Sequence, residues 1–351
     1  MLEYFCNKVV NTNMKTSTAH FGSIDGQAIT AFTMKNASGI QVTILNYGGI
    51  IHSLLIPDKN GKPHECVASC TDLNAYIDDS SYRGAIVGRF ANRIGNAAFE
   101  LGGETYHLEA NGGAHNLHGG VAGFNKKVWD AEIKETNDSA TLCLSLMSED
   151  GEGGFPGNVK VMATYVLSND NSLTFHVKGE TDKATPLSIT QHAYFSLSKA
   201  PTVDSTEVKI SANAITSVDE TLLPTGELLP VANTPFDFST LRPISRNQTL
   251  THPLFERVGG YDHNYIVDCR NDDNPEAEVY AADTGIHLSL YTSLPGIQFY
   301  TGALHCEKPL GALCLEPQYF PDSPNQDTFP SCIVYPDKPY SETIRYVFSI
   351  K

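Results

Sequence analysis

The chain has 351 residues, 41% of them hydrophobic and 18% charged, as expected of a globular protein with a sizeable core. Apolar stretches long enough to span a bilayer, about 20 residues, are missing from the sequence. The 40 acidic residues outnumber the 24 basic residues, and the formal charge of -16 repels nucleic-acid phosphates and anionic lipid surfaces. We therefore expect neither a nucleic acid nor a membrane as a partner, whereas an uncharged small molecule meets no electrostatic barrier.

The first segment, residues 1–15, shows no alternation of apolar and polar residues and is predicted to be an N-terminal extension. It lacks the basic and apolar regions of a secretory signal, which predicts a cytoplasmic protein. The eight cysteines are then expected to be reduced thiols. Because no linker or repeat divides the remainder, we predict one domain over residues 16–351.

Along the chain, strand signals far outnumber helix signals. Residues 72–79 are the best short helix candidate, and strict alternation predicts half-buried strands at residues 141–146, 173–178, 286–291 and 343–350. Turn residues at 60–61, 137–138, 169–171 and 283–285 separate such runs and are typical of antiparallel hairpins. The sequence therefore predicts an all-β fold, and the scarcity of helices argues against a nucleotide-binding βαβ sheet.

Five polar clusters interrupt the strand pattern and carry the residues that could do chemistry. They are GRFANRI at 88–94, NLHGG at 116–120, TQHAYF at 190–195, GYDHN at 260–264, and LCLEPQ at 313–318 followed by FPDSPNQ at 320–326. Each has an ordinary structural explanation as well. Glu316 could be a solvent-facing strand residue, or a carboxylate whose pKa is raised by partial burial so that it serves as a base.

The remaining polar candidates are equally ambiguous when taken one at a time. His118 and His192 could be hydrogen-bonded histidines without a chemical role. Arg93 and Asp262 could form a structural ion pair rather than a binding site. His115 and His118 could suggest a metal, but no third ligand is evident, and the sequence predicts no metal site.

Taken together and in order, the clusters resemble the motifs of the aldose 1-epimerase family, also called galactose mutarotases. The resemblance runs from about Phe21 to Phe348 and includes NLHGGVAGFNKKVW, the loop GEGGFPGN at 151–158, HAYF, GYDHNY, PGIQFYTG and LCLEPQYFPDSPNQ. It implies a large antiparallel twisted β-sandwich of the galactose mutarotase type, an open cleft lined by the motifs, and neither a metal nor an organic cofactor. The implied partner is a free aldohexose, and the implied assembly is a monomer or a homodimer.

The resemblance also implies roles for seven residues. Glu316 would be the catalytic base and His192 the catalytic acid, while five residues would contact the sugar: Asn92, Arg93, His118, Asp262 and Gln298. The implied reaction opens the ring of a free hexose such as glucose or galactose, rotates a bond and closes the ring again. Whether His192 or His118 protonates the ring oxygen stays open, since both fit that chemistry. The motifs differ from the usual family sequence at three positions, which are Gln191, Ser196 and Pro317. These differences leave the preferred hexose open.

Three rival functions use related features. A non-catalytic sugar sensor on the same fold would retain the hydroxyl-binding residues but lose a proton-transfer group, and both Glu316 and His192 are present. A glycoside hydrolase ordinarily needs two carboxylates, for which Asp262 is the obvious partner. A hexose-phosphate 1-epimerase should have additional cationic residues at the cleft, which the sequence alone does not locate.

Overall fold

The computed structural model describes residues 14–247, 250–267, 274–302 and 311–351. Most of the predicted extension, residues 1–13, lies outside this description, while Met14 is buried and Lys15 begins the first strand. Among the described residues, no helix has both the length and the apolar character needed to cross a membrane.

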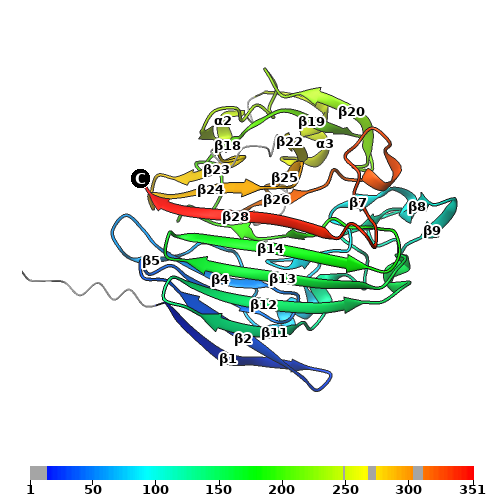
Figure 1. The fold of residues 1–351 in the computed structure, drawn as a ribbon. Coiled ribbons are helices and arrows are strands. Elements are labelled where there is room, and N and C mark those ends of the chain that lie inside the picture. The colour runs from blue at the N-terminus through cyan, green and yellow to red at the C-terminus, as the bar shows by residue number, and fades with distance from the viewer. Residues whose placement is uncertain (1–13, 248–249, 268–273, 303–310) are drawn as a thin grey trace, which may run out of the picture.

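Three antiparallel sheets make up most of the fold (Figure 1). The largest has nine strands in the order β11 (Asp130–Glu135), β12 (Ser139–Ser148), β13 (Val159–Ser168), β14 (Ser172–Thr181), β28 (Tyr340–Ile350), β24 (Ile286–Thr292), β23 (Ala277–Ala281), β18 (Glu207–Ile210), β21 (Arg242–Pro243). The second has six strands in the order β17 (Tyr194–Phe195), β26 (Leu313–Gln318), β25 (Gly296–Tyr300), β22 (Asp262–Val267), β19 (Ala212–Val218), β20 (Pro224–Pro230).

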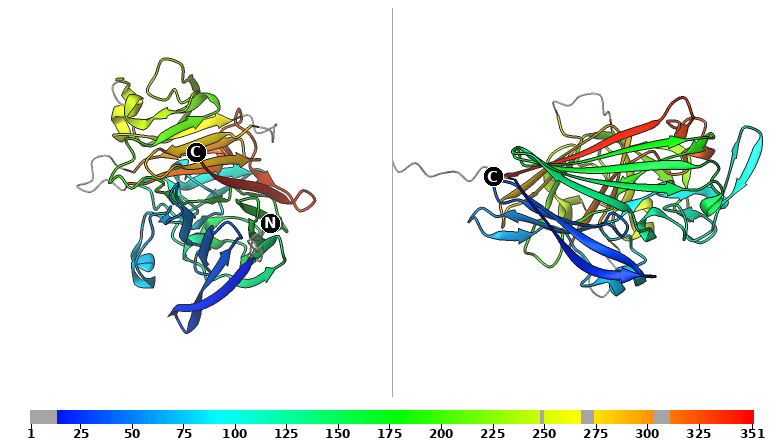
Figure 2. Two further views of the ribbon diagram at one scale, coloured as in Figure 1. Left: turned by 90° about the vertical axis from the view of Figure 1, so that its left-hand side faces the viewer. Right: turned by 60° about the horizontal axis from the view of Figure 1, so that its bottom comes forward.

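The third sheet is formed by the N-terminal strands, the first two of which lie at the bottom of Figure 1. It is formed in chain order by β1 (Lys15–Ile24), β2 (Gln27–Lys35), β3 (Gln41–Leu45), β4 (Ile51–Pro57) and β5 (Pro63–Glu65). Two further views show how strongly the long strands twist across the sheets (Figure 2).

Four short two-stranded pairs and three short helices complete the fold. The pairs are β6 (Ile86–Val87) with β16 (Thr190–Gln191), β7 (Arg93–Ile94) with β10 (Asn116–Leu117), β8 (Ala98–Leu101) with β9 (Glu104–His107), and β15 (Thr185–Pro186) with β27 (Ile333–Val334). The helices are α1 (Leu73–Asp78), α2 (Ile244–Asn247) and α3 (Pro253–Val258). Single 3-10 turns occur at Gly95–Ala97, Phe124–Lys126, Glu152–Gly154 and Ser323–Asn325.

The strands and the helix predicted from periodicity are present in the structure. The four alternating runs belong to β12, β14, β24 and β28, and Asp72 caps α1 by accepting a hydrogen bond from the Ala75 amide. The helix α3 was not anticipated, although Pro253 at its first turn and Gly259 in the left-handed conformation at its end are typical helix boundaries. The all-β prediction is therefore confirmed.

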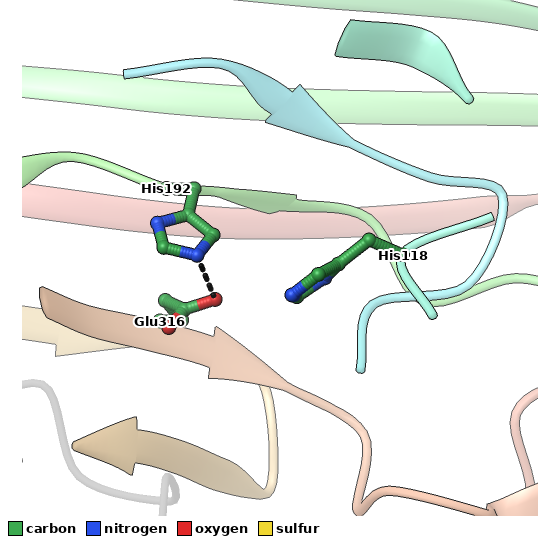
Figure 3. A group of neighbouring side chains, drawn as sticks. All are labelled: His118, His192 and Glu316. Carbon is green, nitrogen blue, oxygen red and sulfur yellow. Dashed lines mark ion pairs between the residues drawn. The ribbon is translucent and has the colours of Figure 1, made fainter. Parts of the chain in front are cut away.

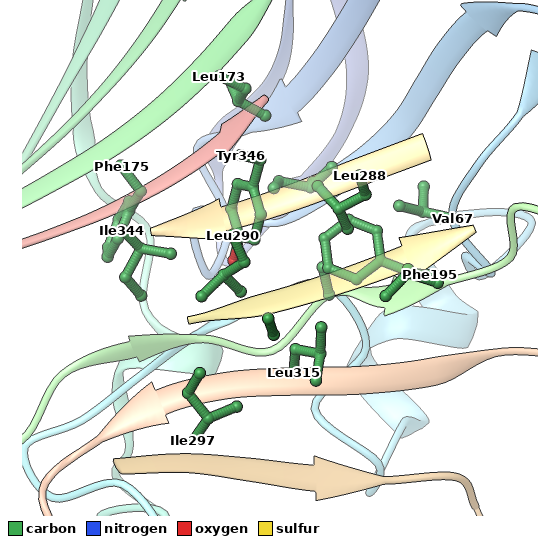
Figure 4. Close-up of a cluster of buried hydrophobic side chains, with 14 of the residues drawn as sticks. Val67, Leu173, Phe175, Phe195, Leu288, Leu290, Ile297, Leu315, Ile344 and Tyr346 are labelled. Carbon is green, nitrogen blue, oxygen red and sulfur yellow. The ribbon is translucent and has the colours of Figure 1, made fainter. Parts of the chain in front are cut away.

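The main core lies where the nine-stranded and six-stranded sheets face each other (Figure 4). Side chains of β14, β24 and β28, such as Phe175, Leu288 and Ile344, meet Ile297 of β25 and Leu315 of β26. On β26 Leu313 and Leu315 contribute to this core, so Cys314 and Glu316, which alternate with them, face the other side of the sheet. The burial of Leu313 and Leu315 thereby determines the direction in which Glu316 projects.

Candidate active site

A cleft of about 240 Å³ on the outer side of the six-stranded sheet collects the polar motifs. All seven residues singled out in the sequence line it. They are Asn92, Arg93, His118, His192, Asp262, Gln298 and Glu316. Its volume is just below the range of about 300–1,000 Å³ typical of sites for drug-sized ligands, which suits a smaller molecule.

Strand register places three of the seven side by side. In the antiparallel pairing of β22, β25 and β26, Gln298 lies opposite Glu316 on one side and Asn264 on the other. Asp262 lies two residues from Asn264 on the same face, and its carboxylate accepts a hydrogen bond of 2.6 Å from Gln298 Nε2. Residues separated by more than fifty positions in the chain thus form one polar surface.

Two other motifs pack against each other to present Asn92 and His118. Leu117 pairs with Arg93, the His118 amide donates to the Asn92 carbonyl, and the Asn92 amide donates to His118 Nδ1 at 3.1 Å. A Cβ on Gly119 would lie 2.1 Å from the Gly88 carbonyl oxygen, so this contact requires glycine. The motifs GRFANRI and NLHGG therefore act as one structural unit.

The hydrogen bond from Asn92 also determines the protonation of His118. Because an amide N–H can only donate, Nδ1 must carry a lone pair, and the proton of the neutral ring is then on Nε2. Burial lowers the pKa of His118 well below its ordinary value, and the nearby His192 and Arg93 lower it further. His118 is thus a neutral imidazole with one N–H to offer.

His192 and Glu316 form the closest acid and base pair in the cleft (Figure 3). His192 Nε2 lies 3.4 Å from Glu316 Oε2, and both side chains are at least 95% buried. Burial lowers the pKa of His192 to about 4, against small opposing effects of its own backbone carbonyl and of Asp79. Burial raises the pKa of Glu316 well above its ordinary value, and the neighbouring Asp262 raises it further.

Because the pKa of His192 is lowered and that of Glu316 is raised, the two groups can share one proton. The proton can be on the carboxyl group with a neutral imidazole, or on the imidazole with a carboxylate, and the total charge is the same. Burial favours the first arrangement, and hydrogen bonds from a ligand to the carboxylate would favour the second. A proton can therefore move between the His192 imidazole and the Glu316 carboxyl group.

Several polar atoms in the cleft have capacity to bind a ligand. Neither Gln298 Oε1 nor Glu316 Oε2 accepts a hydrogen bond from the described residues, and the 3.4 Å separation from His192 is long for such a bond. The Asp262 carboxyl has a pKa that is raised by burial and lowered in part by Arg93. The described residues hold no ion pair between Arg93 and Asp262, so the alternative of a structural ion pair does not apply to them.

His118, His192 and Glu316 also lie close enough together, within 4.8 Å, to be considered as metal ligands. The donor set does not fit a metal well. Since Nδ1 of His118 accepts the Asn92 amide, Nε2 carries the proton and lacks the lone pair that a metal requires. His115, whose Nδ1 accepts the Asn96 amide at 3.0 Å, is not part of this group.

Other residues of the motifs have structural rather than chemical positions. The buried Arg89 donates to Ser148 Oγ, the Pro156 carbonyl and the Glu149 carbonyl, and so connects GRFANRI to the loop at 149–158. Asp322 accepts the Gly95 amide at 2.8 Å, and its own amide donates to the Arg93 carbonyl. These contacts hold the segment that presents Asn92 and Arg93.

Five residues that line the cleft were not anticipated from the sequence: Ser80, Ser81, Tyr82, Leu117 and Tyr300. The first three follow α1 directly and carry no motif that would have indicated them. Among the aromatic residues of the motifs, Tyr194 lines the cleft, while Tyr265 and Phe299 are buried in the core. Of the unusual motif residues, Gln191 and Pro317 are buried and do not line the cleft.

The sequence and the fold match known proteins over nearly the whole chain. The family model for aldose 1-epimerase matches residues 30–347. The chain belongs to the aldose 1-epimerase family. It is 36% identical to galactose mutarotase of Sus scrofa over 323 residues, which cover 89% of this chain and 92% of that protein. It is 34% identical to aldose 1-epimerase of Escherichia coli K12, with 92% and 96% covered.

Solved structures of the family share the architecture. Galactose 1-epimerase from Lactobacillus acidophilus superposes with a TM-score of 0.86 at 25% identity, covering 96% of this chain and 99% of that one. A GalM/aldose epimerase homologue from C. elegans gives 0.82 at 28% identity, covering 89% and 96%. The family and the twisted β-sandwich expected from the motifs are both confirmed.

Proposed function

We propose that this protein is an aldose 1-epimerase that interconverts the α and β anomers of free aldohexoses, with glucose and galactose among its substrates. The observation that carries the proposal is the buried His192–Glu316 pair, 3.4 Å apart, in a cleft lined by hydroxyl-binding side chains. Membership of the aldose 1-epimerase family supports the same reaction.

The proposed reaction moves two protons and leaves the enzyme unchanged. Glu316, as the carboxylate, takes the proton of the O1 hydroxyl while His192, as the imidazolium, gives a proton to the ring oxygen, and the bond from C1 to the ring oxygen breaks. Rotation about C1–C2 presents the other face of the aldehyde. Closure returns both protons with the roles reversed, and each transfer contributes about 100-fold to 10,000-fold in rate.

His118 is proposed to bind the sugar rather than to protonate it. Its Nδ1 is occupied by the Asn92 amide, so a protonated ring would place two N–H groups against each other. Its neutral Nε2–H can donate a hydrogen bond to a substrate oxygen without a change of protonation. His192 is therefore proposed as the acid.

Asn92, Arg93, Asp262 and Gln298 are proposed to bind the sugar hydroxyls. Together they bring donors and acceptors to a substrate whose hydroxyl groups are both. The free acceptor Gln298 Oε1 and the Asp262 carboxyl suit hydroxyl donors, while Arg93 suits hydroxyl oxygens. Arg93 is the sole cationic residue among the described residues that line this cleft, which favours an uncharged hexose over a hexose phosphate.

We further propose a single domain over residues 16–351 and a cytoplasmic location. Support for one domain comes from the main core, whose members extend from Met14 to Phe348. Support for a reducing compartment comes from five described cysteines that are all unpaired: Cys66, Cys70, Cys143, Cys314 and Cys332.

Polarimetry tests the proposed reaction directly. Freshly dissolved α-glucose and α-galactose are followed to anomeric equilibrium with the protein, with its Glu316→Gln variant and with buffer alone. We expect the protein to accelerate the change and the variant to lose at least about 100-fold of that acceleration. No acceleration with either sugar would refute the proposal, and release of nitrophenol from nitrophenyl glycosides would indicate a hydrolase instead.

A further inference from the structure

Tyr82, which no motif indicated, lies against both histidines of the cleft. The centre of its ring is 4.5 Å from that of His118 and 6.2 Å from that of His192, and it is nearly parallel to the latter, at 16°. The Tyr194 ring lies 5.0 Å from His192 at 12°. The Tyr82 and Tyr194 rings thus restrict the orientation of the His192 imidazole.

The backbone of Tyr82 is held in an unfavourable conformation. Its φ of 58° lies in the left-handed region, which a bulky side chain rarely adopts. Such strain persists where surrounding contacts determine the conformation, and it is frequent at functional sites. Glycine would adopt this conformation without strain. The presence of tyrosine therefore indicates that its ring has a role at this position.

Neighbouring contacts couple Tyr82 to the backbone beside each histidine. The Tyr82 hydroxyl accepts a hydrogen bond from Asn111 Nδ2, and Asn111 also makes two hydrogen bonds with the backbone of Leu117, next to His118. Two residues after Tyr82, the Gly84 amide donates to the His192 carbonyl at 2.9 Å.

The segment that carries Tyr82 is anchored at its start as well. Lys126 Nζ donates to the Asp79 carbonyl at 2.8 Å, and the Asp79 carboxylate accepts the Arg83 amide at 3.0 Å. The Tyr194 hydroxyl donates to the Ser81 carbonyl at 2.9 Å. Residues 79–84 therefore form a fixed cover beside the histidines rather than a loop without contacts.

We propose that Tyr82 is a positioning residue for the anomer exchange, whose ring orients the imidazoles of His118 and His192 and keeps water away from them. The proposal rests on the proposed function for its effect on turnover. Its effect on the histidines themselves is independent of any activity.

Exposure of His192 to water should change its titration in a defined direction. Besides Tyr82 itself, the ionisable groups around it are Glu316 of β26, His118, Tyr194 and Asp79 at the end of α1, and beyond these Arg93 and Asp262. None of them changes when Tyr82 is replaced. Since burial is the main cause of the low pKa of His192, about 4, removal of the ring should raise that pKa toward 6.5.

The test compares Tyr82→Ala with Tyr82→Phe, which retains the ring, and with Tyr335→Ala, a control at an exposed tyrosine that does not line the cleft. NMR of isotope-labelled histidines follows the titration of His192, and polarimetry gives kcat and KM. For Tyr82→Ala we expect the pKa of His192 to rise by at least about one unit. We also expect kcat to fall by about 10-fold to 100-fold at a nearly unchanged KM. Tyr82→Phe should retain the His192 pKa of the wild type because it keeps the ring, and the Tyr335→Ala control should stay within about threefold of the wild type in kcat and KM.

The other possible outcomes of this experiment also test the proposal. An unchanged His192 titration in Tyr82→Ala would overturn it, and a higher KM with unchanged kcat would make Tyr82 a wall of the sugar site instead. If Tyr82→Ala does not fold, Tyr82→Leu provides the same comparison. If the wild-type protein fails to accelerate anomer exchange, the proposed function fails, but the histidine titration still decides whether Tyr82 shields His192.

Discussion

His118 and His192 point into the same cleft, but a hydrogen bond to one of them separates their chemistry. The Asn92 amide occupies Nδ1 of His118 and keeps that ring neutral, whereas His192 faces Glu316. We therefore expect His192→Asn to lower kcat by about 100-fold to 10,000-fold, the loss typical of a missing general acid. The matched variant His118→Asn should mainly raise KM. A larger loss of kcat in His118→Asn, measured by polarimetry, would reverse the assignment.

The shared proton of His192 and Glu316 predicts a bell-shaped pH dependence of kcat/KM. Below about 4 a second proton binds His192 and the pair no longer provides a base. Above the raised pKa of Glu316 the pair has lost its last proton and no longer provides an acid. Since the charge of Asp262 contributes to that raised pKa, Asp262→Asn should move the alkaline limb to lower pH. An unmoved limb would show that Asp262 and Glu316 titrate independently.

At the scale of the elements, the Asn264 side chain of β22 lies against Gly296 of β25 and leaves no room for a side chain there. A Cβ there would lie 2.4 Å from Asn264 Oδ1 and 3.0 Å from Phe320 Cδ1. Gly296→Ala should therefore destabilise the fold by about 1–3 kcal/mol and raise KM, because Gln298 lies two residues further along β25. Thermal denaturation and polarimetry measure the two effects.

Asn264→Ala offers a control for this clash, since it removes the atom that the new Cβ would meet. Neither polar atom of the Asn264 side chain has a hydrogen-bond partner among the described residues, so the single variant should be mild. The double variant should recover part of the stability lost in Gly296→Ala. Strictly additive losses would show that the destabilisation has another origin.

At the scale of the whole molecule, buried histidines should make the fold sensitive to acid. His263 on β22 is 1% exposed, its Nδ1 accepts the Asp262 amide at 3.1 Å, and burial lowers its pKa to about 3. The unfolded chain binds this proton near pH 6.5 and the folded chain does not, so stability is lost as the pH falls from about 6.5 toward 3. At pH 5 the loss from this group is about 2 kcal/mol.

Urea denaturation at pH 7 and pH 5 measures this loss in the wild type and in His263→Asn. Asparagine retains an acceptor for the Asp262 amide but does not titrate, so the variant should lose less stability between the two pH values. Taking the difference between the two proteins removes the opposite contributions of Glu316 and Asp262, whose raised pKa values favour the folded state at low pH. Equal losses in both proteins would exclude His263 as a source of acid sensitivity.

The residue pattern was sufficient to predict the all-β class, and the resemblance of the motifs to a family indicated the seven residues that line the cleft. Alternation of apolar and polar residues is a local property with a period of two, so the strands β12, β14, β24 and β28 could be recognised without knowing their partners. The motifs were recognisable because their order and sequence resemble those of a family. That resemblance implied the roles of Glu316 and His192. The face of the sheet toward which Glu316 projects also follows from the sequence. Leu313 and Leu315 alternate with it on the same strand and are buried in the core on the opposite face.

The tertiary structure alone decided what depends on contacts between distant parts of the chain. The neutral state of His118 follows from an amide 26 residues away, and the opposed pKa shifts of His192 and Glu316 follow from their shared burial. The position of Tyr82 against both histidines depends on how α1, Lys126 and the NLHGG motif pack together. Hydrogen-bond partners, desolvation and ring contacts are set by packing between remote segments, and local sequence patterns do not specify them.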